Sequence, residues 1–146
     1  MSLKKTDDHL FFGGVDQNYI MESLKTGHFI EAIQLLHSEL EALLRLLFMI
    51  SFKVKETDED KKQTLESVHE LNYRSLSNAL FIANIISKKQ FNSLILCNKL
   101  RNRIIHKLFE QKYDVDKKTI SKSECKRVAS IGLELMEEFT NKIETI

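Results

Sequence analysis

The sequence predicts an all-α fold, and three observations indicate it. The chain of 146 residues has no proline and only four glycines, so few residues interrupt a helix. Alternating runs of Val, Ile and Thr are missing, as is any Asn-Gly hairpin turn. Apolar residues instead recur at intervals of three and four, the period of an amphipathic helix. We therefore expect an up-and-down bundle of four long helices with one short N-terminal helix.

Composition indicates one globular domain over residues 15–146, preceded by a loose leader at 1–14. With 22 basic and 21 acidic residues the net charge is +1, so nucleic-acid binding would need a local basic cluster. The N-terminus has no apolar signal segment, and the apolar stretch 33–52 carries charged residues. These features predict a cytoplasmic protein without a membrane span. Cys97 and Cys125 lack any framework spacing, which favours buried, reduced thiols.

The N-terminal half is expected to begin with a short helix over 16–25 that ends near Gly27. A long helix over 28–52 follows, with Leu40, Leu43, Leu44 and Leu47 on its core face. Residues 53–63 are charged and poor in apolar side chains, which predicts a solvated connector. The third helix is expected over 64–86, with Leu80 in the core.

Two capping boxes predict where the last two helices begin. Ser87 and Gln90 form the Ser-x-x-Gln pattern before a helix over 87–109, and Ser121 and Glu124 form Ser-x-x-Glu after a polar loop at 110–119. The helix over 87–109 has one broad apolar face, formed by Leu94, Cys97, Leu100, Ile104, Ile105, Leu108 and Phe109. Ile104, Leu108, Ile131 and Leu135 complete the predicted core from these two helices.

The most unusual residues of the chain lie on that apolar face. Arg101 falls near its middle, and Asn102 and His106 share the shoulder beside it. Because a guanidinium keeps its charge, Arg101 must be paired or must line a cavity or an interface. Such a set suits cleavage of a phosphodiester. Histidine can transfer a proton, arginine can stabilise charge on the phosphate, and asparagine can fix the histidine tautomer or hold a phosphate oxygen. Arg103 and Lys107 would add positive charge for RNA binding.

A purely structural role for these residues is the alternative. Five positions turn Arg101 and His106 about 140° apart on a helix, so one chain does not focus both on one atom. Two copies of the helix facing each other across a twofold axis could do so. Otherwise Arg101 pairs with a glutamate in the core and His106 is a surface residue.

A second polar set, Glu39, Glu41 and Arg45, lies on the long helix over 28–52. His37 with Glu41, and Glu41 with Arg45, have the i,i+4 spacing of side chains that meet on a helix. A structural ion pair is the simpler interpretation, and neutralisation of Arg101 by Glu39 or Glu41 is the other. The carboxylates and histidines do not repeat across two helices as a di-metal site requires, so we expect no metal and no cofactor.

The segment Arg101-Asn102-Arg103-Ile104-Ile105-His106 resembles the R-x4–6-H motif of the HEPN superfamily, in the form where a polar residue follows the arginine. The helix with Glu31-Ala32-Ile33 and Glu41-Ala42-Leu43 is similar to that family's early helix, and the likeness spans residues 20–139. This resemblance implies a metal-independent endoribonuclease in which two motif helices pair as a homodimer. Arg101 would then bind the phosphate, Asn102 would orient the site, and His106 would transfer the proton, leaving a 2′,3′-cyclic phosphate.

The resemblance also implies a toxin–antitoxin or defence role, with an antitoxin protein as a possible partner. Some toxin members carry a tyrosine two residues after the histidine, which the antitoxin modifies, whereas this chain has Leu108 there. Many relatives keep the fold and lose activity. The alternative is therefore a non-catalytic HEPN-like dimeric scaffold or regulator, comparable to the mannitol operon repressor group.

Overall fold

The computed structural model describes residues 17–52, 58–109 and 120–146, and these residues form helices and no strand. The all-α prediction is therefore confirmed for this part of the chain. The predicted leader at 1–14, the loop at 110–119 and the side chain of Phe109 lie outside it. The helices are α1 (Gln17–Lys25), α2 (Phe29–Ser51), α3 (Asp58–Glu70), α4 (Tyr73–Ile82), α5 (Lys88–Phe109) and α6 (Lys122–Thr145).

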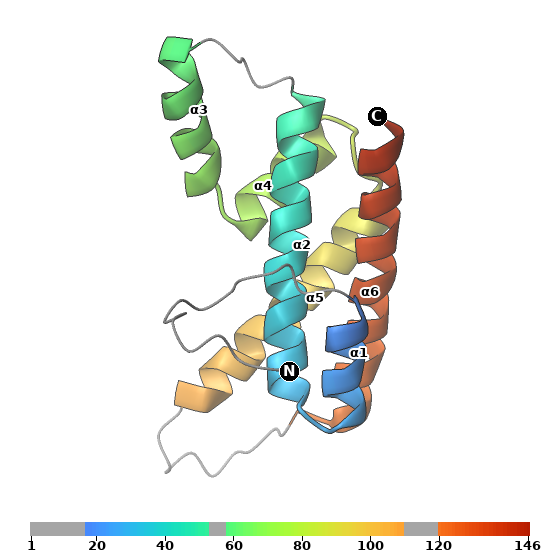
Figure 1. Ribbon diagram of the computed structural model, residues 1–146. Helices are drawn as coiled ribbons and strands as arrows, with labels where there is room; N and C mark the ends of the chain where they lie inside the picture. The colour runs from blue at the N-terminus through green and yellow to red at the C-terminus, as the bar shows by residue number, and fades with distance from the viewer. Residues whose placement is uncertain (1–16, 53–57, 110–119) are drawn as a thin grey trace, which may run out of the picture.

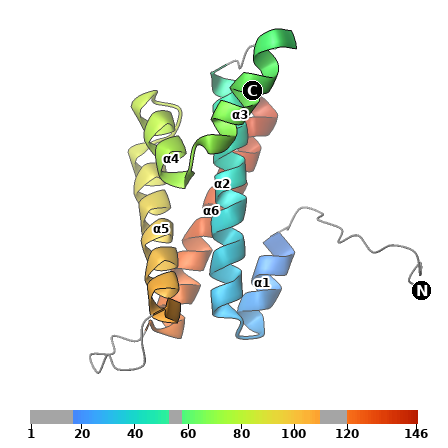
Figure 2. The same ribbon diagram turned by 90° about the vertical axis from the view of Figure 1, so that its left-hand side faces the viewer.

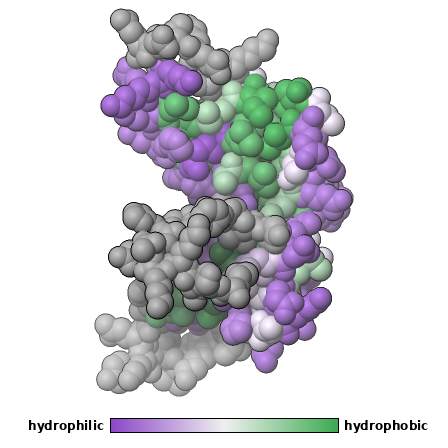
Figure 3. Space-filling model, viewed as in Figure 1, coloured by the Kyte–Doolittle hydropathy of each residue, from purple (hydrophilic) through white to green (hydrophobic). Residues whose placement is uncertain are grey.

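Helix α2 is the central element of the fold. It packs against each of the other five helices. Figures 1 and 2 both show α2 in the middle, and α3 lies at the edge in Figure 1 and in front of the upper end of α2 in Figure 2. This position follows from its sequence, because apolar residues surround most of α2 and such a helix must be covered on several sides. On one face the cover is incomplete: Figure 3 shows apolar side chains over the C-terminal half of α2, where Leu46 is 43% exposed.

The predicted core is largely confirmed. Six of its nine members are buried: Leu40, Leu44, Leu47, Leu80, Ile104 and Leu135. Leu43 and Ile131 are partly buried. The prediction that Leu108 lies in the core is wrong, because its side chain is 55% exposed. It lies in the last turn of α5 and lines an open, mostly apolar groove with Ile30 and Ile104. Periodicity identifies a helix face but not the point along the helix where its neighbours end.

The single helix predicted over 64–86 is wrong, because the structure has two. Helix α3 ends at Glu70, and α4 begins at Tyr73 after Leu71 and Asn72. Asn72 is the N-cap of α4, with its side-chain oxygen accepting hydrogen bonds from the Ser75 backbone N–H at 2.9 Å and the Ser75 hydroxyl at 3.0 Å. Asparagine is among the best N-cap residues, and here it starts a new helix without a glycine or proline.

The connector predicted over 53–63 is also wrong in part, since residues 58–63 belong to α3. Residues 53–57 lie outside the described part of the chain. The segment 59–63 contains Glu, Lys and Gln, which have good helix propensity without an apolar face. Helix α3 packs on α2, and of its side chains at 61–70, which the structure describes, Val68 alone is buried. A helix with so little burial leaves almost no periodic signal in its sequence.

Helix ends follow the local capping chemistry. The predicted box at α5 is confirmed and reciprocal: Ser87 Oγ accepts from the Gln90 N–H at 3.1 Å, and Gln90 Oε1 accepts from the Ser87 N–H at 3.0 Å. At α6, Ser121 Oγ accepts from the Glu124 N–H at 3.1 Å, as predicted. The carboxylate of Glu124 binds Arg103 instead of returning to the cap.

Helix α4 ends in a Schellman motif that turns the chain into α5. Asn84 has a φ of 59°, its N–H donates to the Phe81 carbonyl, and the Ile85 N–H donates to the Leu80 carbonyl. Lys142 near the end of α6 donates to the Ile85 carbonyl, so the last helix also holds this turn. Asparagine tolerates the left-handed conformation better than most residues, which makes it the practical substitute for glycine here.

Gly132 of α6 packs closely against Leu36 of α2, and Gly132→Ala should lower stability. A Cβ there would lie 2.4 Å from Leu36 Cδ2, and Leu36 is only 2% exposed, so its side chain has little room to move. Overpacking of about 1–3 kcal/mol should outweigh the helix-propensity gain of about 1 kcal/mol. Urea unfolding should show a lower midpoint for Gly132→Ala than for the wild type. The midpoint should not fall for Ser130→Ala, an exposed position on the same helix. A Gly132→Ala protein more stable than the wild type would contradict this close approach.

Both cysteines are buried free thiols, as predicted, and burial raises the pKa of Cys97 to about 12. No helix of the described ranges is both long enough and apolar enough to cross a membrane.

Candidate functional site

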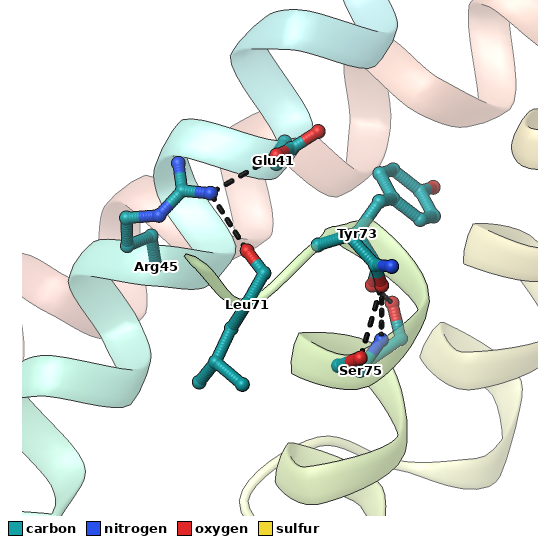
Figure 4. Close-up of polar contacts among 7 residues, drawn as sticks. Glu41, Arg45, Leu71, Tyr73 and Ser75 are labelled. Atoms are coloured by element: carbon teal, nitrogen blue, oxygen red, sulfur yellow. Dashed lines mark hydrogen bonds and ion pairs between the residues drawn. The ribbon is translucent and has the colours of Figure 1, made fainter. Parts of the chain in front are cut away.

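A brace between α2 and the α3–α4 junction shapes the candidate site. Arg45 of α2 donates through one nitrogen, Nη2, to Glu41 Oε1 at 3.0 Å and to the Leu71 carbonyl oxygen at 2.9 Å. Figure 4 shows both contacts, with Tyr73 following on the same stretch of chain. The Leu71 carbonyl is thereby satisfied just after α3 ends. The brace fixes the point where α4 begins, and so places Tyr73 and Arg74 beside α2.

A pocket of about 320 Å³ opens where α2, the start of α4 and the middle of α5 meet. We call it the Arg101 pocket. The residues that line it all carry a polar or charged group: His37, Glu41, Asn72, Tyr73, Arg74, Asn98 and Arg101. The arginine that the sequence places on an apolar face therefore lines a cavity, which is one of the three environments that its permanent charge allows.

His37 is held rigidly in this pocket. Its ring stacks on Tyr73 with centroids 4.4 Å apart, and its Nε2 lies 3.1 Å from Asn98 Oδ1. Because an amide oxygen only accepts, we assign the hydrogen to Nε2, which leaves the lone pair on Nδ1. Burial lowers the pKa of His37, and the positive charge of Arg101 acts in the same direction, against the Asn98 hydrogen bond and Glu41. His37 is therefore a neutral imidazole at pH 7.

Tyr73 is anchored on its other side. Its hydroxyl donates to the Leu94 carbonyl oxygen at 2.8 Å inside the core, and burial raises the pKa of the phenol. Its carbonyl accepts from the Ser77 hydroxyl at 2.7 Å. Tyr73 is thus a neutral structural support for the His37 ring.

Arg101 is half-buried and makes two weak hydrogen bonds. Its Nε donates to Gln34 Oε1 of α2 at 3.3 Å, and its Nη1 donates to Asn102 Oδ1 at 3.3 Å. Glu41 lines the same pocket but is bound to Arg45. The partners of Arg101 are therefore neutral amides, which do not neutralise its charge.

The other residues of the motif lie elsewhere on α5. His106 is exposed and is not part of the Arg101 pocket. Arg103 forms an ion pair with Glu124 of α6 at 2.5 Å. Lys107 lines the apolar groove that includes Ile30 and Leu108. Within one protomer, the structure thus brings Arg101 and Asn102 together and leaves His106 apart from them.

The second polar set also divides. Glu41 and Arg45 form the brace, whereas Glu39 lines a different groove with Gln17 and Thr140. Neither glutamate is the partner of Arg101, whose contacts are Gln34 and Asn102.

Sequence reasoning missed the histidine that does lie beside Arg101. His37 was interpreted only as an i,i+4 neighbour of Glu41. Asn98 and Arg101 have the i,i+3 spacing of one face of α5. A polar pair on each of two helices was the available signal, but nothing in it indicates which pairs face each other. Tyr73 and Arg74 left no signal, because their position depends on the break at Asn72.

Chemically, the pocket offers guanidinium groups, a neutral imidazole and several amide groups, a set suited to binding an anion. Within the described ranges, no group of three His, Cys, Asp or Glu lies close enough to hold a metal ion. Comparison of the chain with protein-family models, curated proteins and solved structures finds no match.

Proposed function

We propose that the protein is a metal-independent endoribonuclease of HEPN type, acting as a homodimer in a cytoplasmic toxin–antitoxin or defence system. The observation that carries the proposal is Arg101, which keeps its charge in a polar pocket on the helix that bears the R-x4–6-H motif. Asn102 contacts Arg101 directly, as a residue that orients the site would. His106 is exposed on the same helix and is available to a second copy.

A dimeric HEPN-like scaffold or regulator is the second candidate. The observation that favours it is the separation of Arg101 from His106 within one protomer, since His106 does not line the Arg101 pocket. A scaffold needs no convergence of the two side chains. The enzyme needs it, and only a dimer through the motif helix would provide it.

The dimer is testable by mass and by cross-linking. Light scattering should give twice the monomer mass across the micromolar range. Asn102 is exposed on α5, and a residue near a twofold axis lies close to its own copy, so Asn102→Cys should form an intersubunit disulfide under mild oxidation. Ser130 is exposed on α6, and Ser130→Cys is the matched control that should form no intersubunit disulfide. A protein that is monomeric at tens of micromolar would remove the composite site.

Activity is tested with purified protein on single-stranded and structured RNAs in EDTA. We expect cleavage that leaves 2′,3′-cyclic phosphate ends, and none where deoxyribose replaces the ribose at the cleaved position. If a broad set of RNAs stays intact while the protein is dimeric, the scaffold replaces the enzyme as the better proposal.

A further inference from the structure

The Arg101 pocket has an excess of positive charge. Arg74 and Arg101 both line it, and Glu41 is the only carboxylate in its lining. Glu41 is already bound to Arg45, which lies outside that lining. Among the residues that the structure describes, Arg74 forms no ion pair, and it is exposed at the start of α4. Two guanidiniums therefore face one small cavity with no anion of their own.

The two asparagines of the pocket have their side-chain oxygens occupied, and their amide nitrogens are left as donors. Asn98 Oδ1 contacts His37, so the amide nitrogen of Asn98 remains as a donor. Asn72 Oδ1 accepts two hydrogen bonds from Ser75, so the amide nitrogen of Asn72 also remains. The N-terminus of α4 begins here, and its dipole adds further positive potential. A pocket rich in donors is complementary to an anion with several acceptor oxygens.

We propose that the Arg101 pocket binds a phosphate group, held by the guanidiniums of Arg74 and Arg101 and by the side-chain amides of Asn72 and Asn98. Its volume of about 320 Å³ is at the small end of the range for ligand pockets, about 300–1,000 Å³, which suits a phosphate with its attached sugar. The inference deepens the proposed function and rests on it for the source of the phosphate, an RNA backbone. Binding itself does not require cleavage.

The pKa of His37 should respond to an anion bound in the Arg101 pocket. The charged groups facing it are Glu41 from α2, Arg74 from α4 and Arg101 from α5, with Tyr73 stacked on its ring. A bound phosphate would bring negative charge beside the ring and favour the imidazolium, so it should raise the pKa of His37 toward the ordinary value of about 6.5.

The experiment follows the His37 ring resonances by NMR while inorganic phosphate replaces chloride at constant ionic strength. We expect saturable shifts and a raised pKa at His37, and no comparable change at the exposed His69. Arg74→Ala and Arg101→Ala should each weaken phosphate binding about tenfold or more, since each removes a charge-assisted contact. Arg127→Ala, an exposed arginine of α6 outside the pocket, should leave it unchanged.

A second arm uses a short RNA that carries 2′-O-methyl groups and cannot be cleaved. Arg74→Ala should weaken its affinity by a similar factor, and Arg127→Ala should not. If phosphate causes no saturable change at His37 beyond chloride, or if the change survives loss of both arginines, the pocket is not a phosphate site. If inorganic phosphate binds but Arg74→Ala leaves the RNA affinity intact, RNA is not the source. Either result leaves the cleavage assay with the wild type to decide the proposed function separately.

Discussion

Leu44→Ala is expected to lower the free energy of unfolding by about 2–5 kcal/mol, the range for removing a fully buried leucine side chain. Leu44 is completely buried in α2, against which every other helix packs. A cavity there cannot be filled by the movement of one neighbour, because the surrounding helices are held by one another. The expected loss is a large fraction of the stability of an ordinary domain, about 5–15 kcal/mol.

The control lies two residues further along the same helix. Leu46→Ala removes the same atoms as Leu44→Ala. Because Leu46 is 43% exposed, this change should lower the free energy of unfolding by less than about 1 kcal/mol. Urea unfolding followed by circular dichroism gives both values, and a protein-concentration series separates folding from any dimer contribution. Equal losses in the two variants would mean that α2 is not the buried centre of the fold.

The parts of the fold that could be predicted are those with a strong local signal. The core face of α2 and the start of α5 came from apolar periodicity and from the Ser87–Gln90 box. The break at Asn72 was missed because an asparagine N-cap looks the same in sequence as an asparagine inside a helix. Its effect depends on Arg45, which holds the Leu71 carbonyl from another helix.

The candidate site divides in the same way. A permanent charge on an apolar face is visible in sequence, so Arg101 could be singled out without a structure. Its surroundings are tertiary: His37 lies 64 positions earlier in the chain, and Tyr73 is oriented by the carbonyl of Leu94. The spacing of Arg101 and His106 indicates that their side chains point in different directions from one helix. The sequence of one chain does not show whether a second copy packs against that helix.

The largest effects on activity are expected at the motif. In the proposed enzyme, His106→Ala should reduce RNA cleavage by about 10²–10⁴-fold, because His106 would carry the proton. Arg101→Ala should cost about 10²–10³-fold, because the guanidinium would stabilise charge on the attacked phosphate. His106 is exposed, so His106→Ala should unfold at the wild-type urea concentration. Single-turnover rates on one labelled RNA measure all variants on the same scale.

His69→Ala and Arg127→Ala are the matched controls, since both residues are exposed and lie on α3 and α6. Both variants should cleave at the wild-type rate. His37→Gln separates the two histidines, because glutamine keeps a donor for Asn98 but cannot take up a proton. If cleavage survives His106→Ala and is lost in a folded His37→Gln protein, the proton is moved by the histidine beside Arg101, and each protomer has its own active site. If His106→Ala alone abolishes cleavage, the two copies of α5 must meet, since only a second protomer brings His106 to the phosphate that Arg101 holds.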